Sequence, residues 1–221
     1  MLTLVLTRHG LTDRSDPEQH LGQGLDIGLS EAGRAQAAEL AARIGGQRFD
    51  RIVSSPLVRA LETARSIAGD RPVAIDRRLA EMDYGTWEGL TYAEIEDRDP
   101  SYRARWVADP ATVACPGGES GDEVADRARA FLDDELGAAS GIAERVVLAV
   151  AHSSLDRILL CVALGIPIRE YRDRFTQSQV NVTALTFPPD GRPDEARLLV
   201  MNDTAHVAPA GRPPWEPSPG A

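Results

Sequence analysis

The chain has 221 residues, of which 43% are hydrophobic, and a formal net charge of −10 at pH 7. This composition is typical of a globular protein with a sizeable core, and the acidic excess disfavours polyanionic partners such as nucleic acids or anionic membrane surfaces. All 24 basic residues are arginine, which excludes lysine Schiff bases and P-loops and leaves anion binding to arginine, histidine and backbone N–H groups.

The cysteines and the first residues indicate the compartment. Cys115 and Cys161 are far apart and form no CxxC pair, which predicts free thiols and neither a disulfide framework nor a zinc site. No apolar run approaches the roughly 20 residues of a membrane helix. Residues 1–7 have no basic segment and no small-residue cleavage site, so they do not resemble a signal peptide. We therefore expect a cytoplasmic protein that binds neither nucleic acid nor membranes.

Short β-branched segments alternate with longer amphipathic segments, a pattern typical of an α/β fold. The first helix, predicted over 30–44, has Ser30 as its N-cap and apolar residues at helical spacing, and it is followed by Gly45. We expect a three-layer sandwich in which a mostly parallel central sheet has helices on both faces. The predicted strands are 2–7, 51–54, 73–75, 146–151, 182–187 and 196–201.

Three further helices are predicted along the chain. The second begins at Pro56, a residue that suits the first helical position. The third extends over 120–136. The fourth covers 155–164, after His152, and Gly165 ends it.

Two segments differ in composition from the rest. Residues 80–118 contain Trp87 and Trp106, two of the three tryptophans, and we interpret them as an insertion with short helices that forms a lid or binding loop. Both tryptophans are expected to belong to the core or the lid. The tail 208–221 is rich in proline, glycine and alanine and is predicted to lack regular structure. Residues 1–207 then form a single domain.

Residues suited to phosphate binding follow three of the predicted strands. They are Arg8 and His9 after the first strand, Arg59 one helical turn after the second, and His152 after the strand 146–151. Because the carboxyl ends of parallel strands lie along one edge of a sheet, these side chains should converge in one crevice. Two histidines and two arginines beside helix N-termini predict a pocket for a phosphoryl group.

Five sequence blocks extend this pattern along the chain. They are TRHGLT at 7–12, GQGLDIGLSEAG at 22–33, SSPLVRALETA at 54–64, LAEMDYGTWEG at 79–89, and PGGES at 116–120 with the Ala151-His152 pair. In this order they resemble the histidine phosphatase superfamily, which includes cofactor-dependent phosphoglycerate mutases and many phosphomonoesterases. The RHG triplet alone would be a weak signal, whereas five ordered blocks are specific.

The resemblance implies a role for each of five residues. His9 would be the nucleophile and form a phosphohistidine, since a neutral imidazole attacks phosphorus without a separate base. Arg8, Arg59 and His152 would hold the phosphoryl oxygens. Glu81 would protonate the leaving alkoxide and then take a proton from the attacking water. The reaction would need neither a metal ion nor a cofactor.

Further substrate contacts are expected from Thr12, Ser15, Gln23 and Ser153, in addition to Arg8, Arg59 and His152. Three positions depart from the family pattern. Ser15 stands where Asn is frequent, Ser153 stands where Gly is usual, and Leu11 stands where many members have Glu or Gln. These departures bear on the substrate and on catalytic efficiency rather than on the nucleophile.

The other two histidines, His20 and His206, lie outside the five blocks. A histidine without a matching motif is more often a hydrogen-bonded structural residue than a ligand. We therefore interpret both as structural and place His20 near the rim of the pocket.

The sequence favours a phosphomonoesterase that hydrolyses a small phosphorylated metabolite. One alternative is a 2,3-bisphosphoglycerate-dependent phosphoglycerate mutase, but the interval 90–115 is short and supplies only Arg98, Arg103 and Arg105 for a second phosphate. A non-catalytic phospholigand-binding module is a further alternative, although it would be expected to have lost a core residue of the motifs. The sequence selects neither the natural substrate nor the oligomeric state, and a homodimer remains open.

Overall fold

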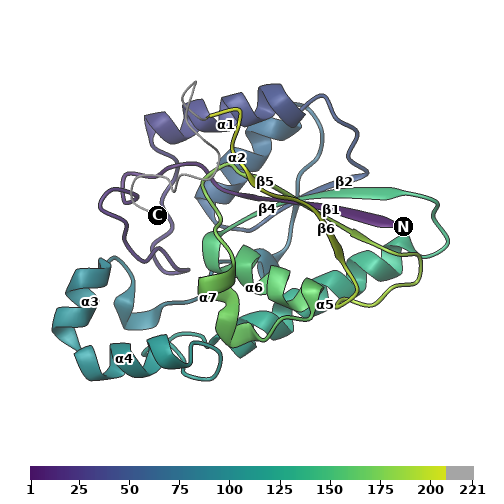
Figure 1. The fold of residues 1–221 in the computed structure, drawn as a ribbon. Helices are drawn as coiled ribbons and strands as arrows, with labels where there is room; N and C mark the ends of the chain where they lie inside the picture. Colours follow the sequence, from purple (N-terminus) through teal and green to yellow (C-terminus); the bar gives the residue numbers. More distant parts are fainter. Residues whose placement is uncertain (208–221) are drawn as a thin grey trace.

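A six-stranded sheet forms the centre of the computed structural model, which describes residues 1–207 (Figure 1). The strand order is β3-β2-β4-β1-β5-β6, with β3, β2, β4 and β1 parallel to one another and β5 antiparallel to both β1 and β6. The predicted mostly parallel sheet is thus confirmed. The strands are β1 (Leu2–Arg8), β2 (Arg51–Ser54), β3 (Ala74–Ile75), β4 (Arg145–Ala151), β5 (Val182–Phe187) and β6 (Arg197–Asp203).

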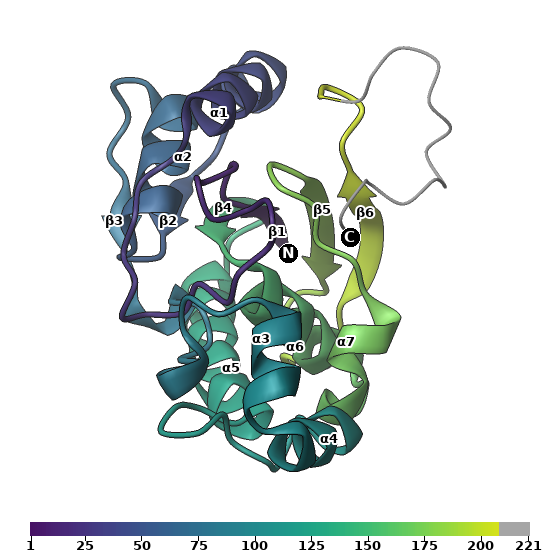
Figure 2. The same cartoon turned by 90° about the vertical axis from the view of Figure 1, so that its left-hand side faces the viewer.

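Helices cover both faces of the sheet and complete the three layers. One face carries α1 (Glu31–Ile44) and α2 (Val58–Ala68), and the other carries α5 (Gly121–Ala139) and α6 (Ser153–Leu164) (Figure 1). The short helices α3 (Tyr92–Arg98), α4 (Pro100–Ala108) and α7 (Tyr171–Arg174) lie toward the carboxyl ends of the central strands (Figure 2). Single 3₁₀ turns occupy Arg77–Leu79, Gly85–Trp87 and Ile168–Glu170.

Local capping explains why the predicted helices form close to their expected bounds. The Ser30 side chain accepts a hydrogen bond from the Gly33 N–H at the start of α1, as an N-cap should. Ser120 and Glu123 form a reciprocal capping box at the start of α5. Gly165 ends α6 in a left-handed conformation that glycine adopts without a steric penalty.

The prediction that α2 begins at Pro56 is wrong by two residues, since the helix begins at Val58. Leu57 is extended, and its N–H donates to the Ser55 hydroxyl at 3.3 Å. The Val58 N–H donates to a carboxylate oxygen of Asp26 at 2.7 Å. A residue 32 positions away therefore satisfies the first helical N–H, and no local pattern around Pro56 reveals that partner.

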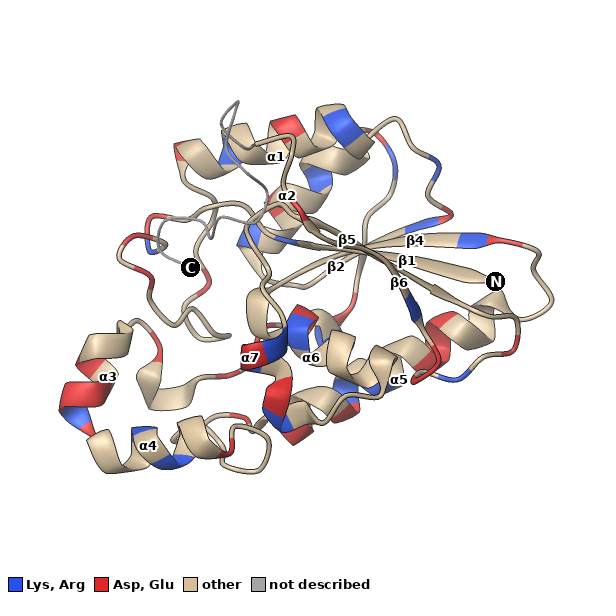
Figure 3. Ribbon diagram, viewed as in Figure 1, with Lys and Arg blue, Asp and Glu red and all other residues tan. Residues whose placement is uncertain are grey.

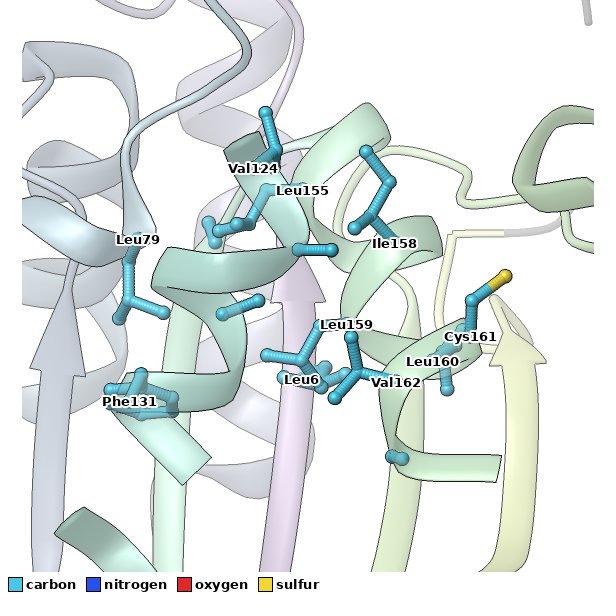
Figure 4. Close-up of a cluster of buried hydrophobic side chains, with 14 of the residues drawn as sticks. Leu6, Leu79, Val124, Phe131, Leu155, Ile158, Leu159, Leu160, Cys161 and Val162 are labelled. Atoms are coloured by element: carbon cyan, nitrogen blue, oxygen red, sulfur yellow. The ribbon is translucent and has the colours of Figure 1, made fainter. Parts of the chain in front are cut away.

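Alternate residues of β4 bury their side chains in two separate hydrophobic layers. Val147 and Ala149 belong to the larger cluster, which fills the space between the sheet and helices α5 and α6 (Figure 4). Leu148 and Val150 belong to the smaller cluster beneath α1 and α2. This two-residue alternation is what a strand with both faces covered requires. Burial on both faces fixes β4, and therefore the position of the residue that follows it.

The segment 80–118 contains the predicted short helices, α3 and α4. Trp87 and Trp106 are each 2% exposed and meet edge to face with ring centroids 5.5 Å apart, a favoured aromatic geometry. A lid function for this segment stays a prediction, and the expectation for the tail 208–221 falls outside the described residues.

The structure also bears on the cysteines, on membrane-spanning helices and on the distribution of charged residues. Cys115 and Cys161 are both free and buried. Within residues 1–207, no helix combines the length and apolar character needed to cross a membrane. Acidic and basic residues are interspersed along α1, α3 and α5 (Figure 3).

Candidate active site

Two of the residues that the sequence singled out, His9 and His152, meet Ser55 at the carboxyl ends of the neighbouring strands β1, β2 and β4. His9 follows β1, and its backbone N–H donates to the Ala151 carbonyl at the end of β4 at 3.1 Å. The His9 and His152 rings lie with centroids 5.1 Å apart. The His152 Nε2 lies 2.7 Å from the hydroxyl oxygen of Ser55, which follows β2. Parallel pairing of these strands thus brings residues from distant parts of the sequence into one site.

The His9 ring is held in the tautomer that a nucleophile needs. Its Nδ1 lies 2.7 Å from the Gly10 carbonyl oxygen, and because a carbonyl only accepts, Nδ1 carries the proton and Nε2 keeps its lone pair. Burial, followed by the charges of Arg59 and Arg8, lowers the pKa of His9 well below 6.5. The ring is therefore neutral at neutral pH, with Nε2 ready to attack an electrophile.

His152 is the N-cap residue of α6 and is completely buried. Burial, followed by the charge of Arg59, lowers the pKa of its imidazole well below 6.5. Its Nδ1 has no hydrogen-bond partner among residues 1–207. This ring is thus a neutral hydrogen-bonding group beside His9.

The Glu81 carboxylate is anchored by backbone N–H groups, two of which belong to the first turn of α6. Its Oε1 accepts from Met82 at 2.8 Å and from Leu155 at 3.1 Å, and its Oε2 accepts from Ser154 at 3.2 Å. Since each carboxylate oxygen has two lone pairs, Oε1 is fully occupied and Oε2 has one position left. Of the two carboxylate oxygens, only Oε2 therefore has a position left for a further hydrogen-bond partner.

Side chains from other blocks fix the backbone around Glu81. The Gln23 side-chain amide donates to the Glu81 carbonyl at 2.8 Å. Arg127 of α5 donates to the carbonyls of Ala80 and Glu81 at 2.6 and 3.1 Å and pairs with Glu119. The sequence assigned Gln23 to substrate binding, whereas in the structure it supports the acid-bearing segment and does not line the cavity at the site.

Arg8 faces the cavity and is held from two directions. Its Nη2 lies 3.1 Å from the Glu18 carboxylate, and its Nη1 donates to the Gln177 carbonyl at 3.0 Å. Arg8 and Glu18 are both among the residues that line the cavity. The guanidinium is thus positioned at the site beside an acidic group that the sequence motifs did not identify.

Arg59 lies beneath the cavity rather than on its wall. The side chain is completely buried, and its guanidinium donates to the carbonyls of Leu21, Gly22 and Leu25 at 2.9 to 3.3 Å. Arg59 therefore anchors the loop that follows the RHG signature. Its charge still acts on the site, because it lowers the pKa of both His9 and His152.

Two glycines allow the signature loop to approach α1 at backbone distance. A Cβ on Gly33 would lie 1.9 Å from the Leu11 carbonyl oxygen, and a Cβ on Gly10 would lie 2.6 Å from the Gly33 carbonyl oxygen. Neither position has room for a side chain. Glycine at these motif positions is therefore needed for close backbone packing behind His9.

The cavity has a volume of about 880 Å³, within the range usual for small-molecule sites. Arg8, His9, Glu81, Ser15 and Ser153 line it. The other predicted site residues Thr12, Gln23, Arg59 and His152 are outside its lining.

Thr12 and Ser15, both predicted to contact substrate, form hydrogen bonds with each other in the structure. Their hydroxyl oxygens are 3.2 Å apart, and the Thr12 N–H donates to the Ser15 hydroxyl at 3.0 Å. Thr12 is buried, and only Ser15 reaches the cavity wall. Thr12 thus serves the loop conformation in this structure.

His20 lines the cavity, as its expected place near the rim suggested, and packs edge-on against Tyr84 and Tyr92. Burial lowers the pKa of its imidazole to about 4 despite a hydrogen bond to the Leu90 carbonyl. His206 lies away from the cavity lining and contacts Arg43 at 3.0 Å.

Sequence patterns did not identify several other residues of the lining, among them Arg157, Tyr171 and Arg172. They follow the last motif and come together through packing of α6 against α7. No group of three or more His, Cys, Asp or Glu side chains is arranged to hold a metal ion within residues 1–207.

A comparison with models of protein families identifies the family of the chain. The model described as the histidine phosphatase superfamily (branch 1) matches residues 4–204. The chain belongs to this family. Known members of the superfamily can therefore be compared with this histidine phosphatase over most of its length.

Individual relatives agree with the family assignment. A bifunctional protein of Mycobacterium tuberculosis is 42% identical over 168 residues, 73% of this histidine phosphatase, which spans only 44% of that protein's length. A glucosyl-3-phosphoglycerate phosphatase of Mycolicibacterium vanbaalenii is 40% identical over 174 residues, 75% of each chain. A crystal structure of an Entamoeba histolytica phosphoserine phosphatase, in complex with 3-phosphoglyceric acid, is 29% identical and covers 94% of this chain and 100% of its own, with a TM-score of 0.80.

Proposed function

We propose that this histidine phosphatase is a metal-independent phosphomonoesterase that hydrolyses a small phosphorylated metabolite through a phosphohistidine at His9. The single observation that carries the proposal is the His9 ring, whose Nδ1 lies 2.7 Å from the Gly10 carbonyl and whose Nε2 is therefore unprotonated. The relatives named as phosphatases of small phosphate esters support the same reaction.

In the first half-reaction, the His9 Nε2 attacks the phosphorus of the ester in line with the leaving oxygen. The N–P bond forms as the P–O bond to the alcohol breaks. Glu81, protonated on Oε2, gives its proton to the leaving alkoxide, and the alcohol departs.

In the second half-reaction, the ionised Glu81 takes a proton from a water molecule that attacks the phosphohistidine. The P–O bond to water forms, the N–P bond breaks, and inorganic phosphate leaves with His9 restored to its neutral form. Glu81 ends the cycle protonated, so no proton is lost or gained by the enzyme.

Positive charge for the transition state comes from two arginines. Arg8, on the cavity wall, would contact the phosphoryl oxygens once its pair with Glu18 opens. Arg59 would act from behind His9 and His152 through its charge and by fixing the loop at 21–25. His152 would donate a hydrogen bond to the phosphoryl group from Nδ1, the ring nitrogen without a partner among residues 1–207. Ser15 and Ser153 would contact substrate from the cavity wall.

The proposal is tested by trapping the intermediate. Turnover of a ³²P-labelled phosphate ester, quenched in alkali, should yield an acid-labile label on His9. His9→Ala should carry no label and should lose at least about a thousandfold in the rate of aryl phosphate hydrolysis, because the nucleophile is gone. A matched control, His206→Ala, removes an imidazole outside the cavity lining. This variant should keep both the label on His9 and the wild-type rate of aryl phosphate hydrolysis.

Two further experiments test whether the reaction needs a metal ion and whether the enzyme is a hydrolase rather than a mutase. A chelator should leave the rate unchanged, and a large loss would show that a metal takes part. Monophosphoglycerate should not be isomerised in a way that depends on 2,3-bisphosphoglycerate; if it is, the enzyme is a mutase. Label retained in His9→Ala would refute the phosphohistidine at this position.

A further inference from the structure

Part of the cavity wall takes no part in the chemistry proposed above. Arg157 of α6, with Tyr171 and Arg172 of α7, lines the same cavity as His9 and Glu81. Trp106 of α4 and Tyr92 of α3 complete this part of the lining. A wall of two guanidinium groups, a phenol and aromatic rings is suited to bind more of a substrate than its phosphoryl group.

The two arginines of this wall have charge that no other residue neutralises. Neither Arg157 nor Arg172 pairs with a carboxylate anywhere in the part of the chain that the structure describes. The neighbouring Asp156 is fully buried, and burial raises the pKa of its carboxyl well above 3.8, an effect that nearby Glu81 reinforces. The Asp156 carboxyl therefore has a weakened tendency to carry the negative charge that would neutralise Arg157.

The polar atoms of this wall also lack hydrogen-bond partners. The Arg157 Nε is buried and without a partner among residues 1–207, and so is the hydroxyl of Tyr171, which is 1% exposed. Buried donors without partners are rare in folded proteins, and a ligand in this cavity would complete their hydrogen bonding.

Stacking fixes the second arginine in a geometry that a ligand can use. The Arg172 guanidinium lies over the Trp106 ring, 4.5 Å from its centroid. A guanidinium stacked in this way is fixed in its plane, while the N–H groups along its edge stay free to bind the oxygens of a carboxylate or phosphate.

We infer that Arg157, Arg172 and Tyr171 bind a second anionic group of the substrate, a carboxylate or a second phosphate, distinct from the ester phosphate at His9. The inference rests on the proposed phosphatase function and deepens it, since it specifies a phosphorylated acid rather than a neutral sugar or alcohol phosphate. The unpaired donors explain the preference, because only an acceptor that carries negative charge satisfies both guanidinium groups.

A matched pair of substrates isolates the second anion. 3-Phosphoglycerate and glycerol 3-phosphate share the same three-carbon skeleton and differ only in a carboxylate against a hydroxymethyl group. The wild-type kcat/KM should be at least about tenfold higher for 3-phosphoglycerate, as expected for a charge-assisted hydrogen bond. Glycerol 1,3-bisphosphate replaces the carboxylate by a second phosphate. A kcat/KM at least about tenfold higher for this ester than for 3-phosphoglycerate would show that the second group is a phosphate.

Substitutions then assign the preference to residues. Arg157→Gln and, separately, Arg172→Gln should each reduce the ratio of kcat/KM for 3-phosphoglycerate over glycerol 3-phosphate about tenfold. Arg169→Gln is the matched control, because Arg169 is a nearby exposed arginine that does not line this cavity, and its ratio should equal that of the wild type.

Two outcomes would overturn the inference while leaving the phosphatase function intact. One is a wild-type enzyme that labels His9 but hydrolyses all three esters with equal kcat/KM. The other is a pair of variants in which both substrates decline equally, so that the ratio does not move. Failure of the proposed function is recognised separately, by the absence of label on His9.

Discussion

The buried imidazole of His20 should make the stability of the protein depend on pH. Burial lowers the pKa of His20 to about 4, from 6.5 for an unperturbed histidine. Between these values the unfolded chain binds a proton that the folded protein excludes, so the free energy of unfolding decreases as the pH falls. From pH 7 to pH 5 this single group lowers the stability by about 2 kcal/mol.

The effect is isolated by comparing the wild type with His20→Gln at two pH values. Glutamine keeps a donor for the Leu90 carbonyl but does not titrate. The variant loses packing against two tyrosines at either pH, so its free energy of unfolding at pH 7 should be lower than that of the wild type. At pH 5 this deficit in the free energy of unfolding should be smaller by about 2 kcal/mol. His9 and His152 also titrate on unfolding, but they do so in both proteins and cancel in the comparison.

Urea unfolding followed by circular dichroism provides the measurement. Tyr102→Phe serves as the control, because it removes a 3.0 Å hydrogen bond to the Ala114 carbonyl in the same region without removing a group that titrates near neutral pH. Its deficit should be the same at pH 7 and pH 5. An unchanged deficit for His20→Gln as well would show that the imidazole is not excluded from protonation in the folded state.

Two further predictions concern the acid and the signature loop. Glu81→Gln should slow hydrolysis of alkyl phosphates by about 10² to 10⁴ and hydrolysis of p-nitrophenyl phosphate much less, because a good leaving group needs no proton; equal slowing in a comparison of kcat/KM would remove Glu81 as the general acid. Gly33→Ala should lower the free energy of unfolding by about 1–3 kcal/mol and reduce activity, because its Cβ would lie 1.9 Å from the Leu11 carbonyl oxygen. Gly46→Ala, with nothing within 4 Å, should change neither, and similar melting curves for the two variants would contradict the packing argument.

Elements with short-range signals were predictable from the sequence. The Ser30 cap and the glycine after Ile44 define α1 within the helix itself, and the structure agrees. The start of α2 depends instead on Asp26, and the burial of Arg59 depends on carbonyls at 21–25. Contacts between distant segments are not encoded in local periodicity, which explains both differences.

In the candidate site, too, the sequence motifs identified some residues, whereas others reach the cavity only through contacts between distant segments. The motifs identified His9 and Glu81, and both line the cavity. They also identified Gln23 as a substrate ligand, but a motif shows only that a residue is needed, and the structure shows Gln23 bound to the backbone of Glu81. Arg157 and Arg172 belong to no motif, and only the packing of α6 against α7 brings them to the cavity.

One end of one helix contacts two of the residues to which the proposed mechanism assigns roles. His152 is the N-cap of α6, and the N–H groups of Ser154 and Leu155, two and three residues further on, hold the Glu81 carboxylate. A displacement of α6 would therefore move His152 together with two of the N–H groups that orient the Glu81 carboxylate, and would alter the distances of both groups to His9. Under the proposed mechanism, substitutions that shift this helix should consequently affect both half-reactions rather than one alone.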